Sequence, residues 1–523
     1  WPVFYYGQHY MGSLEALLTA ALFALCGVSA AAVKAVPLFF SLVLVPLMYA
    51  LTRQVAGKTA ARFAAALTAM PPSALVVWSA MARGGFIEVI VIGAFALWLA
   101  CRWLKSGPSY LGTFLIGLLL GLGWWVNNQI VYFMLPVGFG MFCALVRLTR
   151  GRIAALLSHF VCGLVAFFLG GAAFWIYNIN NNFSSFGIFK GAASRQALEY
   201  LQGAFDKALP IILGARRFWQ QTDIFSAASP VILGLWAFII ALAVVLRWRQ
   251  VLALFAFKIE RRAPLELHLI FLLSCLAVFS LSSFGWLSEA PRYLLPMYVG
   301  LFVLAGFVLE RLVAARAVMA RGPCWTCLGA LLCSNLLSSY SGRRGIPGEP
   351  VVFGGERVSK DHSQLIAFLR DKGIDYLRTN YWIGYRLAFE TCENVKFAVF
   401  GDPHQTRIAS YLDGRRDNLD EIPLLLVPSQ AYVKSALQLT GHSYSVAQLS
   451  GYLLVYDIRP TQSGLKPVAR ETYIARASHK SEDAHLAVDG DLETRWGSAR
   501  PQETGMEFSL RMDPPRKIRA LRY

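Results

Sequence analysis

Polar and ionisable side chains gather in four short segments that border long apolar runs of this chain, at 5–15, 83–88, 124–129 and 288–293. Carboxylates and arginines at a membrane boundary are costly, so they usually pair with one another or serve a site. A carboxylate can take a proton from a hydroxyl group, and a guanidinium group can clamp a phosphate. The candidate residues in these segments are Tyr6, Gln8, His9, Tyr10, Glu15, Arg83, Glu88, Arg292 and Tyr293. The pattern favours chemistry at a membrane surface.

The elements that must position these residues are membrane-spanning helices. Hydrophobic residues make up 56% of the 523 residues and charged residues only 15%, and the mean hydropathy is +0.48. Apolar runs long enough to cross about 30 Å of hydrocarbon recur along the first two thirds of the chain. We predict spans at 33–52, 60–78, 86–103, 111–125, 130–145, 153–177, 231–246, 265–284, 294–309 and 324–337. Pro71-Pro72 should kink the second span.

Basic residues occupy alternate connections between these spans, which is the pattern of cytoplasmic loops. They occur at 53–62, 102–105, 147–152, 247–262 and 311–321. The loop 178–230 also holds five basic residues, but most of them are far from the membrane ends. The four polar segments, the opening residues and the tail are therefore predicted to be extracytoplasmic. The net charge of +18 arises mainly from connections that face anionic lipid, and no nucleic-acid-binding motif is present.

The tail after residue 340 has the composition of soluble domains. Helical periodicity at 364–372 ends at Gly373, and strand-like runs follow at 394–400, 424–427 and 451–458. We predict a small α/β domain over 341–464, after a transmembrane domain over 1–340. Tyr381, Trp382 and Tyr385 could stack on sugars or pack in its core.

The last part, 465–523, resembles the first third of a discoidin (coagulation factor type C) domain. The matching residues include Asp489-Gly490-Asp491 and Thr494-Arg495-Trp496. The resemblance implies a partial β-sandwich of a kind that often binds glycans. Asp489, Asp491 and Thr494 supply the hard oxygen ligands that suit a structural calcium ion, and a solvated turn without an ion is the alternative.

The first 460 residues resemble the GT-C-fold membrane glycosyltransferases, in the group of protein mannosyltransferase-like and aminoarabinose-transferase-like enzymes. The similar stretches are FYYGQHYMGSLEALLTAALFALCGVS, RGGFIEVIVIGAF, APRYLLPMY and LRTNYWIGYRLAFE. The resemblance implies a polytopic α-helical fold and a polyprenyl-phosphate sugar donor that is used outside the cytoplasmic (inner or plasma) membrane. It also implies a catalytic acid just after a first span. No residue matches that acid because the chain starts at Trp1, so we expect a truncated, inactive fragment.

Within this resemblance the remaining roles follow from chemistry. An inverting transfer needs a base near the acceptor oxygen and stabilisation for the departing lipid phosphate. We assign the catalytic carboxylates to Glu88 and Glu15, and the phosphate to Arg292, supported by Tyr293, with Arg83 as second choice. Tyr6, Gln8, His9 and Tyr10 would line the acceptor or sugar site. Glu88 could instead be a helix-end acid paired with Arg83, and His9 an ordinary interfacial histidine.

Two other classes of function stay open. A transporter or lipid flippase would show ionisable residues at mid-span and broken or repeated spans. A non-catalytic membrane protein would use the discoidin-like segment to bind glycans. The sequence does not define the sugar, the acceptor (a glycan, lipid or protein) or the need for a divalent metal at the transferase site.

Overall fold

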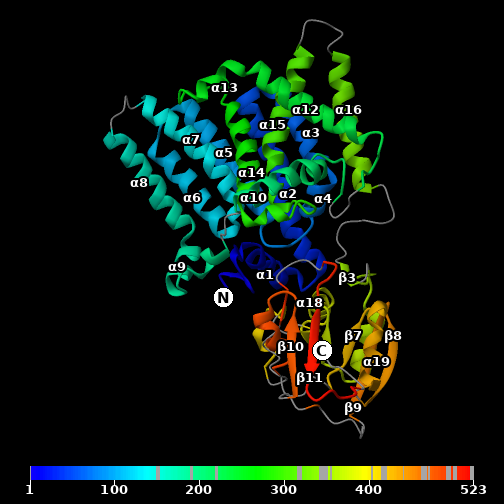
Figure 1. The fold of residues 1–523 in the computed structure, drawn as a ribbon. Helices are drawn as coiled ribbons and strands as arrows, with labels where there is room; N and C mark the ends of the chain where they lie inside the picture. Colours follow the sequence, from blue (N-terminus) through cyan, green and yellow to red (C-terminus); the bar gives the residue numbers. More distant parts are fainter. Residues whose placement is uncertain are drawn as a thin grey trace. The chain divides into compact units, whose positions relative to one another are not determined.

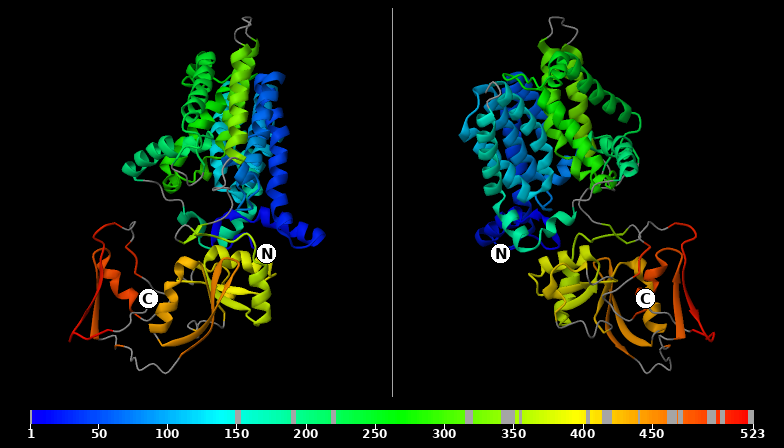
Figure 2. Two further views of the ribbon diagram at one scale, coloured as in Figure 1. Left: turned by 90° about the vertical axis from the view of Figure 1, so that its right-hand side faces the viewer. Right: turned by 60° about the vertical axis from the view of Figure 1, so that its left-hand side comes forward.

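The structure is a computed structural model that describes residues 2–148, 153–188, 193–217, 222–314, 321–340, 351–353, 356–401, 405–413, 421–439, 441–460, 468, 472–489, 496–498 and 503–518. The chain divides into two compact units, Trp1–Gly348 and Glu349–Tyr523. The first unit is a bundle of long helices, and the second is built around a β-sheet (Figures 1 and 2).

Each predicted span contains an α-helix in the structure. The α-helices of the first unit are α1 (Leu14–Cys26), α2 (Ala30–Ala56), α3 (Lys58–Ala69), α4 (Ser73–Ser79), α5 (Phe86–Ser106), α6 (Tyr110–Val126), α7 (Val131–Leu148), α8 (Ile153–Gly170), α9 (Ala172–Asn180), α10 (Ser194–Gly203), α11 (Leu209–Ile212), α12 (Ser229–Leu246), α13 (Trp248–Leu254), α14 (Glu266–Leu281), α15 (Met297–Ala314) and α16 (Arg321–Tyr340). Within the described residues, six are long and apolar enough to cross a membrane, or seven when α3 and α4 count as one broken span.

Two predicted spans are not continuous helices. The second breaks by 70° between α3 and α4, because Pro71 and Pro72 cannot supply the backbone donors that would continue the helix. The sixth breaks at Gly171, between α8 and α9. Four short helices outside the ten spans, α1, α10, α11 and α13, were not predicted from the sequence.

The basic and the polar connections occupy opposite ends of the helical unit. Helix α13, which lies in the basic connection 247–262, is at one end, whereas α1 and α9 are at the other (Figure 1). This separation agrees with the alternation that the sequence predicts for a membrane protein. All four polar segments therefore belong to one end of the bundle.

Helices α5 and α15 form the centre of the bundle. In the most apolar 18-residue stretch of each helix, 78% of the residues are buried in α5 and 72% in α15. Helix α15 approaches α3 closely, since a Cβ atom on Gly306 would lie 2.4 Å from the carbonyl oxygen of Ala60. Small residues allow such backbone contact between membrane helices. The rigid centre holds the start of α5 and the segment before α15, where Glu88 and Arg292 occur.

The second unit contains a five-stranded sheet in the order β6-β5-β7-β9-β8. Strand β5 pairs in parallel with both β6 and β7, and β9 pairs antiparallel with β7 and β8. The strands and helices of this unit are β3 (Val351–Phe353), β4 (Glu356–Arg357), α17 (Ser363–Asp371), β5 (Tyr376–Thr379), α18 (Tyr381–Glu390), β6 (Lys396–Val399), β7 (Leu424–Leu426), α19 (Tyr432–Leu439), β8 (His442–Leu449), β9 (Tyr452–Pro460), β10 (Tyr473–Ala477) and β11 (Phe508–Met512). The helix and three strand-like runs that the sequence predicts are α17, β6, β7 and β9.

Strands β10 and β11 form a separate antiparallel pair in the segment that resembles a discoidin domain. The indole ring of Trp496 packs against Phe508 with 5.1 Å between ring centroids, and its Nε1 donates to the carbonyl oxygen of His479. Of the predicted calcium ligands, Asp489 follows a 3₁₀ helix at Ser481–Ala487, while Asp491 and Thr494 lie outside the described residues. The calcium site therefore stays a prediction.

Candidate functional site

A short β-hairpin at the start of the chain covers the polar end of the bundle. It pairs β1 (Phe4–Tyr5) with β2 (Gln8–Gly12) around a turn in which Gly7 has a positive φ of 68°. The hairpin is anchored to the end of α6, because the Trp125 indole nitrogen donates to the carbonyl oxygen of Val3 at 3.0 Å. Gly12 lies directly against α6, where a Cβ atom would come within 2.3 Å of the Trp125 carbonyl oxygen.

Glu15, in the first turn of α1, binds the turn that precedes α5. Its Oε2 atom accepts hydrogen bonds from the backbone nitrogens of Gly84 and Gly85, each at 3.0 Å. Both glycines have left-handed φ angles, 83° and 75°, which turn two successive N–H groups toward one oxygen. Such a pair of amides at a helix N-terminus is an anion-binding nest. The carboxylate thereby joins α1 to the start of α5.

The nest is tightly enclosed, which explains why it consists of glycines. A Cβ atom on Gly84 would lie 2.7 Å from the Met11 sulfur, and one on Gly85 would lie 2.6 Å from a Val126 methyl group. The Asn127 side-chain nitrogen donates to the Gly84 carbonyl oxygen at 3.0 Å. The hairpin, α6 and α5 therefore fix the backbone that holds the Glu15 carboxylate.

Glu88 forms a buried carboxylate pair with Glu15. The two residues are 1% and 2% exposed, and Tyr5 lies next to both of them. Within the part of the chain that the structure describes, the Oε1 atoms of Glu15 and Glu88 have no hydrogen-bond partner. Burial raises the pKa of Glu15 to about 7, although the amides of Gly85 and Gly84 stabilise its charged form. Burial, with the charge of Glu15, also raises the pKa of the Tyr5 phenol.

Arg292 and Tyr293 lie in a 3₁₀ turn (Arg292–Leu294) just before α15. The Tyr293 ring stacks on Phe284 at 4.3 Å between centroids and contacts Phe86 at 5.9 Å. The Arg292 guanidinium carbon lies 5.4 Å from the centre of the same tyrosine ring. Phe86 is two residues before Glu88, so it links this arginine–tyrosine pair to the carboxylate pair. Burial raises the pKa of Tyr293, which therefore stays a hydroxyl donor at neutral pH.

The four aromatic and polar residues predicted for the acceptor site have different surroundings. Tyr10 lies close enough to Tyr293 to interact with it electrostatically, and its ring centroid is 6.1 Å from that of Phe284. Tyr6 is 58% exposed at the hairpin turn, and Gln8 is partly buried on β2. The His9 ring stacks on Tyr177 of α9, and its Nδ1 lies 2.8 Å from the Tyr177 hydroxyl group.

The structure thus joins two sets of predicted residues. Glu15 and Glu88 form one set, with Arg83 immediately before the glycine nest, and Tyr10, Arg292 and Tyr293 form the other. His9 instead contacts Tyr177 of α9. Asp489 belongs to the second unit.

Several residues of this site were not among the predicted ones. Tyr5, Gly84 and Gly85 bind or border the carboxylate pair directly, and Asn127 binds the Gly84 carbonyl oxygen. Gln129 is 4% exposed, and its side-chain amide has no partner among the described residues. Two signals could have found them: paired glycines just before an acidic helix start, and the polar run 127–129 between two apolar spans.

The carboxylate pair has the ligand chemistry of a hard divalent cation, which prefers carboxylate and amide oxygens. A group of three or more histidine, cysteine, aspartate or glutamate side chains in metal-binding proximity is not found in the described parts of the chain. Two adjacent carboxylates can also share one proton, because both charges together are unfavourable in a buried site. Glu15 and Glu88 interact electrostatically, so the proton affinity of each depends on the charge of the other.

No protein-family model and no curated protein matches the chain by sequence. Solved structures do resemble it. The crystal structure of ArnT from Cupriavidus metallidurans bound to undecaprenyl phosphate covers 88% of this chain and 90% of its own, with a TM-score of 0.50 and 13% identity. The archaeal oligosaccharyltransferase AglB from Archaeoglobus fulgidus, in complex with an inhibitory peptide and a dolichol-phosphate, covers 89% of this chain and 68% of its own, with a TM-score of 0.44 and 13% identity.

At 13% identity the likeness to ArnT is a likeness of fold. ArnT is a GT-C-fold glycosyltransferase. The described helices, and the sheet that follows them along the chain, thus occur in the same order as in ArnT over most of both chains. The chain has the GT-C-type fold that its sequence resemblance implies.

Proposed function

We propose that this chain is an integral-membrane glycosyltransferase that moves a sugar from a polyprenyl-phosphate donor to an acceptor outside the cytoplasm. The observation that carries the proposal is the buried Glu15–Glu88 pair, held over the Gly84–Gly85 nest at the end of the bundle that lacks the basic connections. A buried carboxylate pair is expensive to maintain, so its presence at an interface favours a catalytic role. The bound undecaprenyl phosphate of the ArnT neighbour supports the class of donor.

The carboxylate pair would serve as the general base. At rest one of the two side chains would hold a proton, and the amides of Gly84 and Gly85 would stabilise the charge on Glu15. The pair takes a second proton from the acceptor hydroxyl group as the acceptor oxygen bonds to the anomeric carbon. A base whose pKa lies near the working pH is effective in such a step, and burial brings the pKa of Glu15 to about 7.

Arg292 would stabilise the leaving group. As the bond between the anomeric carbon and the phosphate oxygen breaks, both bonding electrons stay on the polyprenyl phosphate. A guanidinium group can bind that phosphate through two parallel hydrogen bonds. The Arg292 Nε atom is buried and has no hydrogen-bond partner within the described residues, so it can donate to such a ligand. Tyr293 would hold the guanidinium group through the contact with its ring.

Transfer from a labelled polyprenyl-phosphate sugar, assayed in membranes that carry the full-length protein, tests the proposal. We expect Arg292→Ala and Glu88→Gln each to lose more than about 99% of the activity. Each substitution removes a charged contact that stabilises the transition state by about 3 kcal/mol, which corresponds to a rate change of about a hundredfold. Glu289→Gln is the matched control, because Glu289 pairs with Lys207 in the same outer segment and is partly exposed. Unchanged turnover in Arg292→Ala would remove Arg292 from the phosphate role, and full activity in Glu88→Gln would contradict the base.

One feature favours a second candidate, a lipid transporter. The span formed by α3 and α4 is broken by 70°, and broken spans are typical of transporters. Reconstituted vesicles distinguish the two functions, since a transporter moves a polyprenyl phosphate across the bilayer without consuming a sugar. Translocation that persists in Glu88→Gln, together with no transfer by the unmodified protein, would favour the transporter.

The discoidin-like segment would add glycan binding to the transferase. Its Trp496 packs on the β10–β11 pair, in keeping with a folded strand pair around the motif. Titration of the full-length protein with calcium, followed by tryptophan fluorescence, tests the ion. An identical response in Asp489→Asn and in the unmodified protein would rule out Asp489 as a ligand.

A further inference from the structure

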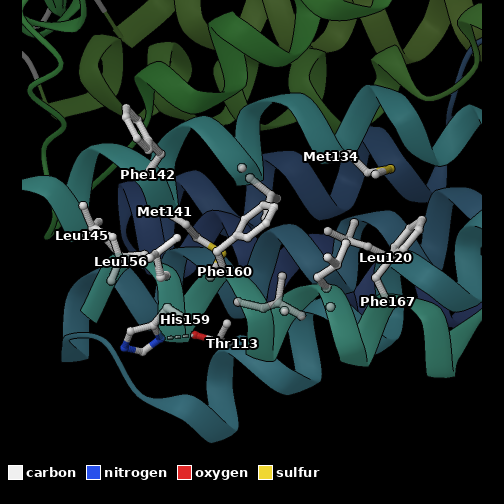
Figure 3. Close-up of a pocket in the computed structure, with 17 residues that line it drawn as sticks. Thr113, Leu120, Met134, Met141, Phe142, Leu145, Leu156, His159, Phe160 and Phe167 are labelled. Carbon is white, nitrogen blue, oxygen red and sulfur yellow. Dashed lines mark hydrogen bonds between the residues drawn. The ribbon is translucent and has the colours of Figure 1, made fainter. Parts of the chain in front are cut away.

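Three buried histidines among the described residues, His159, His268 and His362, differ in their partners. His159 lies at one end of an apolar cleft of about 480 Å³, which forms where α7 diverges from α6 and α8 (Figure 3). Its Nδ1 lies 2.9 Å from the Thr113 hydroxyl group, a neutral partner. His268 lies in the first turn of α14. His362, in the second unit, differs from both, because its two ring nitrogens link a carboxylate to a phenol.

His362 belongs to a closed ring of hydrogen bonds. Its Nδ1 lies 2.7 Å from the Glu390 carboxylate, and its Nε2 lies 2.9 Å from the Tyr452 hydroxyl group. The Tyr452 oxygen accepts from the backbone nitrogen of Ser359 at 2.6 Å. Arg386 completes the ring, because it donates to Glu390 at 2.8 Å and to the Ser359 carbonyl oxygen at 2.6 Å. The ring therefore ties the segment that joins β4 to α17 to both α18 and β9.

The donors and acceptors of this ring fit one arrangement of protons. Glu390, ionised beside Arg386, can only accept, so the His362 Nδ1 carries a proton. The Tyr452 oxygen already accepts from the Ser359 amide, so its own proton is directed at the His362 Nε2. Burial raises the pKa of Tyr452, so the phenol keeps this proton. The imidazole ring is therefore neutral, and its Nε2 is an acceptor.

A second proton on His362 does not fit the ring. With a proton on Nε2, the imidazolium and the Tyr452 hydroxyl group would each direct a proton at the other. Tyr452 is 1% exposed, and its hydroxyl group has no further partner among the described residues to which it could turn. The closed ring thus opposes the charged form of His362.

The charges that face His362 come from three elements. Burial lowers the pKa of His362 below its ordinary value of 6.5, and the positive charge of Arg386 on α18 acts in the same direction. The carboxylates of Glu390 on α18 and of Asp361, just before α17, act in the opposite direction, and the neutral phenol of Tyr452 on β9 adds no charge. The closed segment therefore binds a proton less readily than the open segment does.

We propose that this ring is an acid-sensitive latch, in which charging of His362 breaks the bond to Tyr452 and releases the segment between β4 and α17. The latch is independent of the transfer reaction proposed above. It is closed above about pH 6.5, and protons that bind the open segment favour opening as the pH decreases below that value. The sequence predicts this unit outside the cytoplasm, where a histidine switch would respond to the pH of the surroundings.

Hydrogen exchange of the full-length protein in lipid nanodiscs tests the latch. Peptides that cover Ser359 are compared by mass spectrometry at pH 7.5 and pH 5.5, after correction for the intrinsic dependence of exchange on pH. A group that binds its proton in the open form alone, with a pKa of about 6.5, changes the ratio of open to closed forms about tenfold between these values.

We therefore expect the protection of the Ser359 amide to decrease about tenfold at pH 5.5. Strand β7, in the middle of the sheet, should keep its protection at both pH values. An equal loss of protection in β7 would show that the whole unit unfolds, and would overturn the latch.

His362→Gln removes the titrating group. Glutamine can donate to Glu390 and accept from Tyr452, but it does not titrate in this range. The protection of Ser359 should then be the same at both pH values, and an unchanged tenfold response would overturn the proposal. His485→Gln is the matched control, because His485 is an exposed histidine of the same unit, and it should keep the full response.

Tyr452→Phe is a second test, which does not depend on how glutamine fits the ring. It removes the acceptor of the Ser359 amide and the phenol proton that opposes a charged His362. The Ser359 amide should exchange faster than in the unmodified protein at pH 7.5, with no further increase at pH 5.5. A tenfold response to acid in Tyr452→Phe would show that the segment opens by another route, and would overturn the latch.

Discussion

Replacement of Glu15 by glutamine should stabilise the helical unit at alkaline pH while it impairs transfer. The side chain keeps an oxygen for the Gly84 and Gly85 amides, each now 3.0 Å from the Glu15 carboxylate, but it carries no charge. Burial raises the pKa of Glu15 from its ordinary value of 4.5 to about 7. The folded state therefore holds this proton more tightly than the unfolded state does.

The sign and size of the effect follow from linkage. Between pH 4.5 and about 7 the unfolded chain releases the Glu15 proton first, so the free energy of unfolding decreases as the pH rises through this window. Each unit of pKa difference corresponds to about 1.4 kcal/mol, which gives a penalty of about 3 kcal/mol above pH 7 and none below pH 4.5. Glu15→Gln removes the penalty, and it also relieves the repulsion between Glu15 and Glu88.

Thiol labelling during thermal unfolding measures this prediction for the helical unit alone. Cys101, Cys143 and Cys275 are buried there and free, so they react only when that unit opens. We expect Glu15→Gln to unfold several degrees above the unmodified protein at pH 8, and at the same temperature at pH 4.5. Glu289→Gln, which removes a partly exposed ion pair with Lys207, should change the free energy by no more than about 1 kcal/mol at either pH. If the difference in unfolding temperature between Glu15→Gln and the unmodified protein does not depend on pH, the claim that burial raises the pKa of Glu15 is refuted.

Three other substitutions test the surrounding structure. Gly85→Ala should lower the rate of transfer at least about tenfold. An alanine in the left-handed region costs about 1–2 kcal/mol, and its Cβ atom would lie 2.6 Å from Val126. A rate equal to that of the unmodified protein would show that the backbone at Gly84 and Gly85 does not matter for transfer. Asn127→Ala removes the side-chain donor of the buried Gly84 carbonyl oxygen. It should lower the free energy of unfolding of the helical unit by about 1–3 kcal/mol in the thiol-labelling assay. Asn181→Ala removes a hydrogen bond at an exposed position and should leave that free energy unchanged. Tyr452→Phe removes the oxygen that binds the Ser359 amide at 2.6 Å and the His362 Nε2 at 2.9 Å, and should increase hydrogen exchange around residue 359 in the full-length protein; unchanged exchange would show that this network contributes nothing.

The sequence predicted the spans, and the separation of the basic connections from the polar segments, because both depend on local properties. The hydrocarbon core excludes charges and unsatisfied backbone groups. The length of an apolar run therefore predicts a span, and the arginines beside it predict its orientation, without knowledge of the rest of the chain. The break at Pro71-Pro72 and the polar segments around Glu15, Glu88 and Arg292 follow from the same reasoning. Helix α10, in the loop 178–230, was not predicted because it is amphipathic and has no long apolar run.

The candidate site was predicted only as a set of separate segments. Glu15 and Arg83 are both visible in the sequence, but the glycine nest that joins their segments depends on two backbone angles and on the exact approach of α1, α5 and α6. His9 looks as suitable as Glu15 in the sequence, yet its ring contacts Tyr177. Nothing local distinguishes the two, because each orientation is set by helices far away along the chain.

The order of the residues determined a helical membrane protein in which the polar segments and most of the basic connections are at opposite ends, since burial of apolar surface and exclusion of charge act on each segment independently. Tertiary structure alone decided which acids meet, that Gly84 and Gly85 hold one of them, and that α7 diverges from α6 and α8 to leave a cleft. Those outcomes depend on contacts between residues distant in the chain, where a single methyl group added at Gly85 would already collide with Val126.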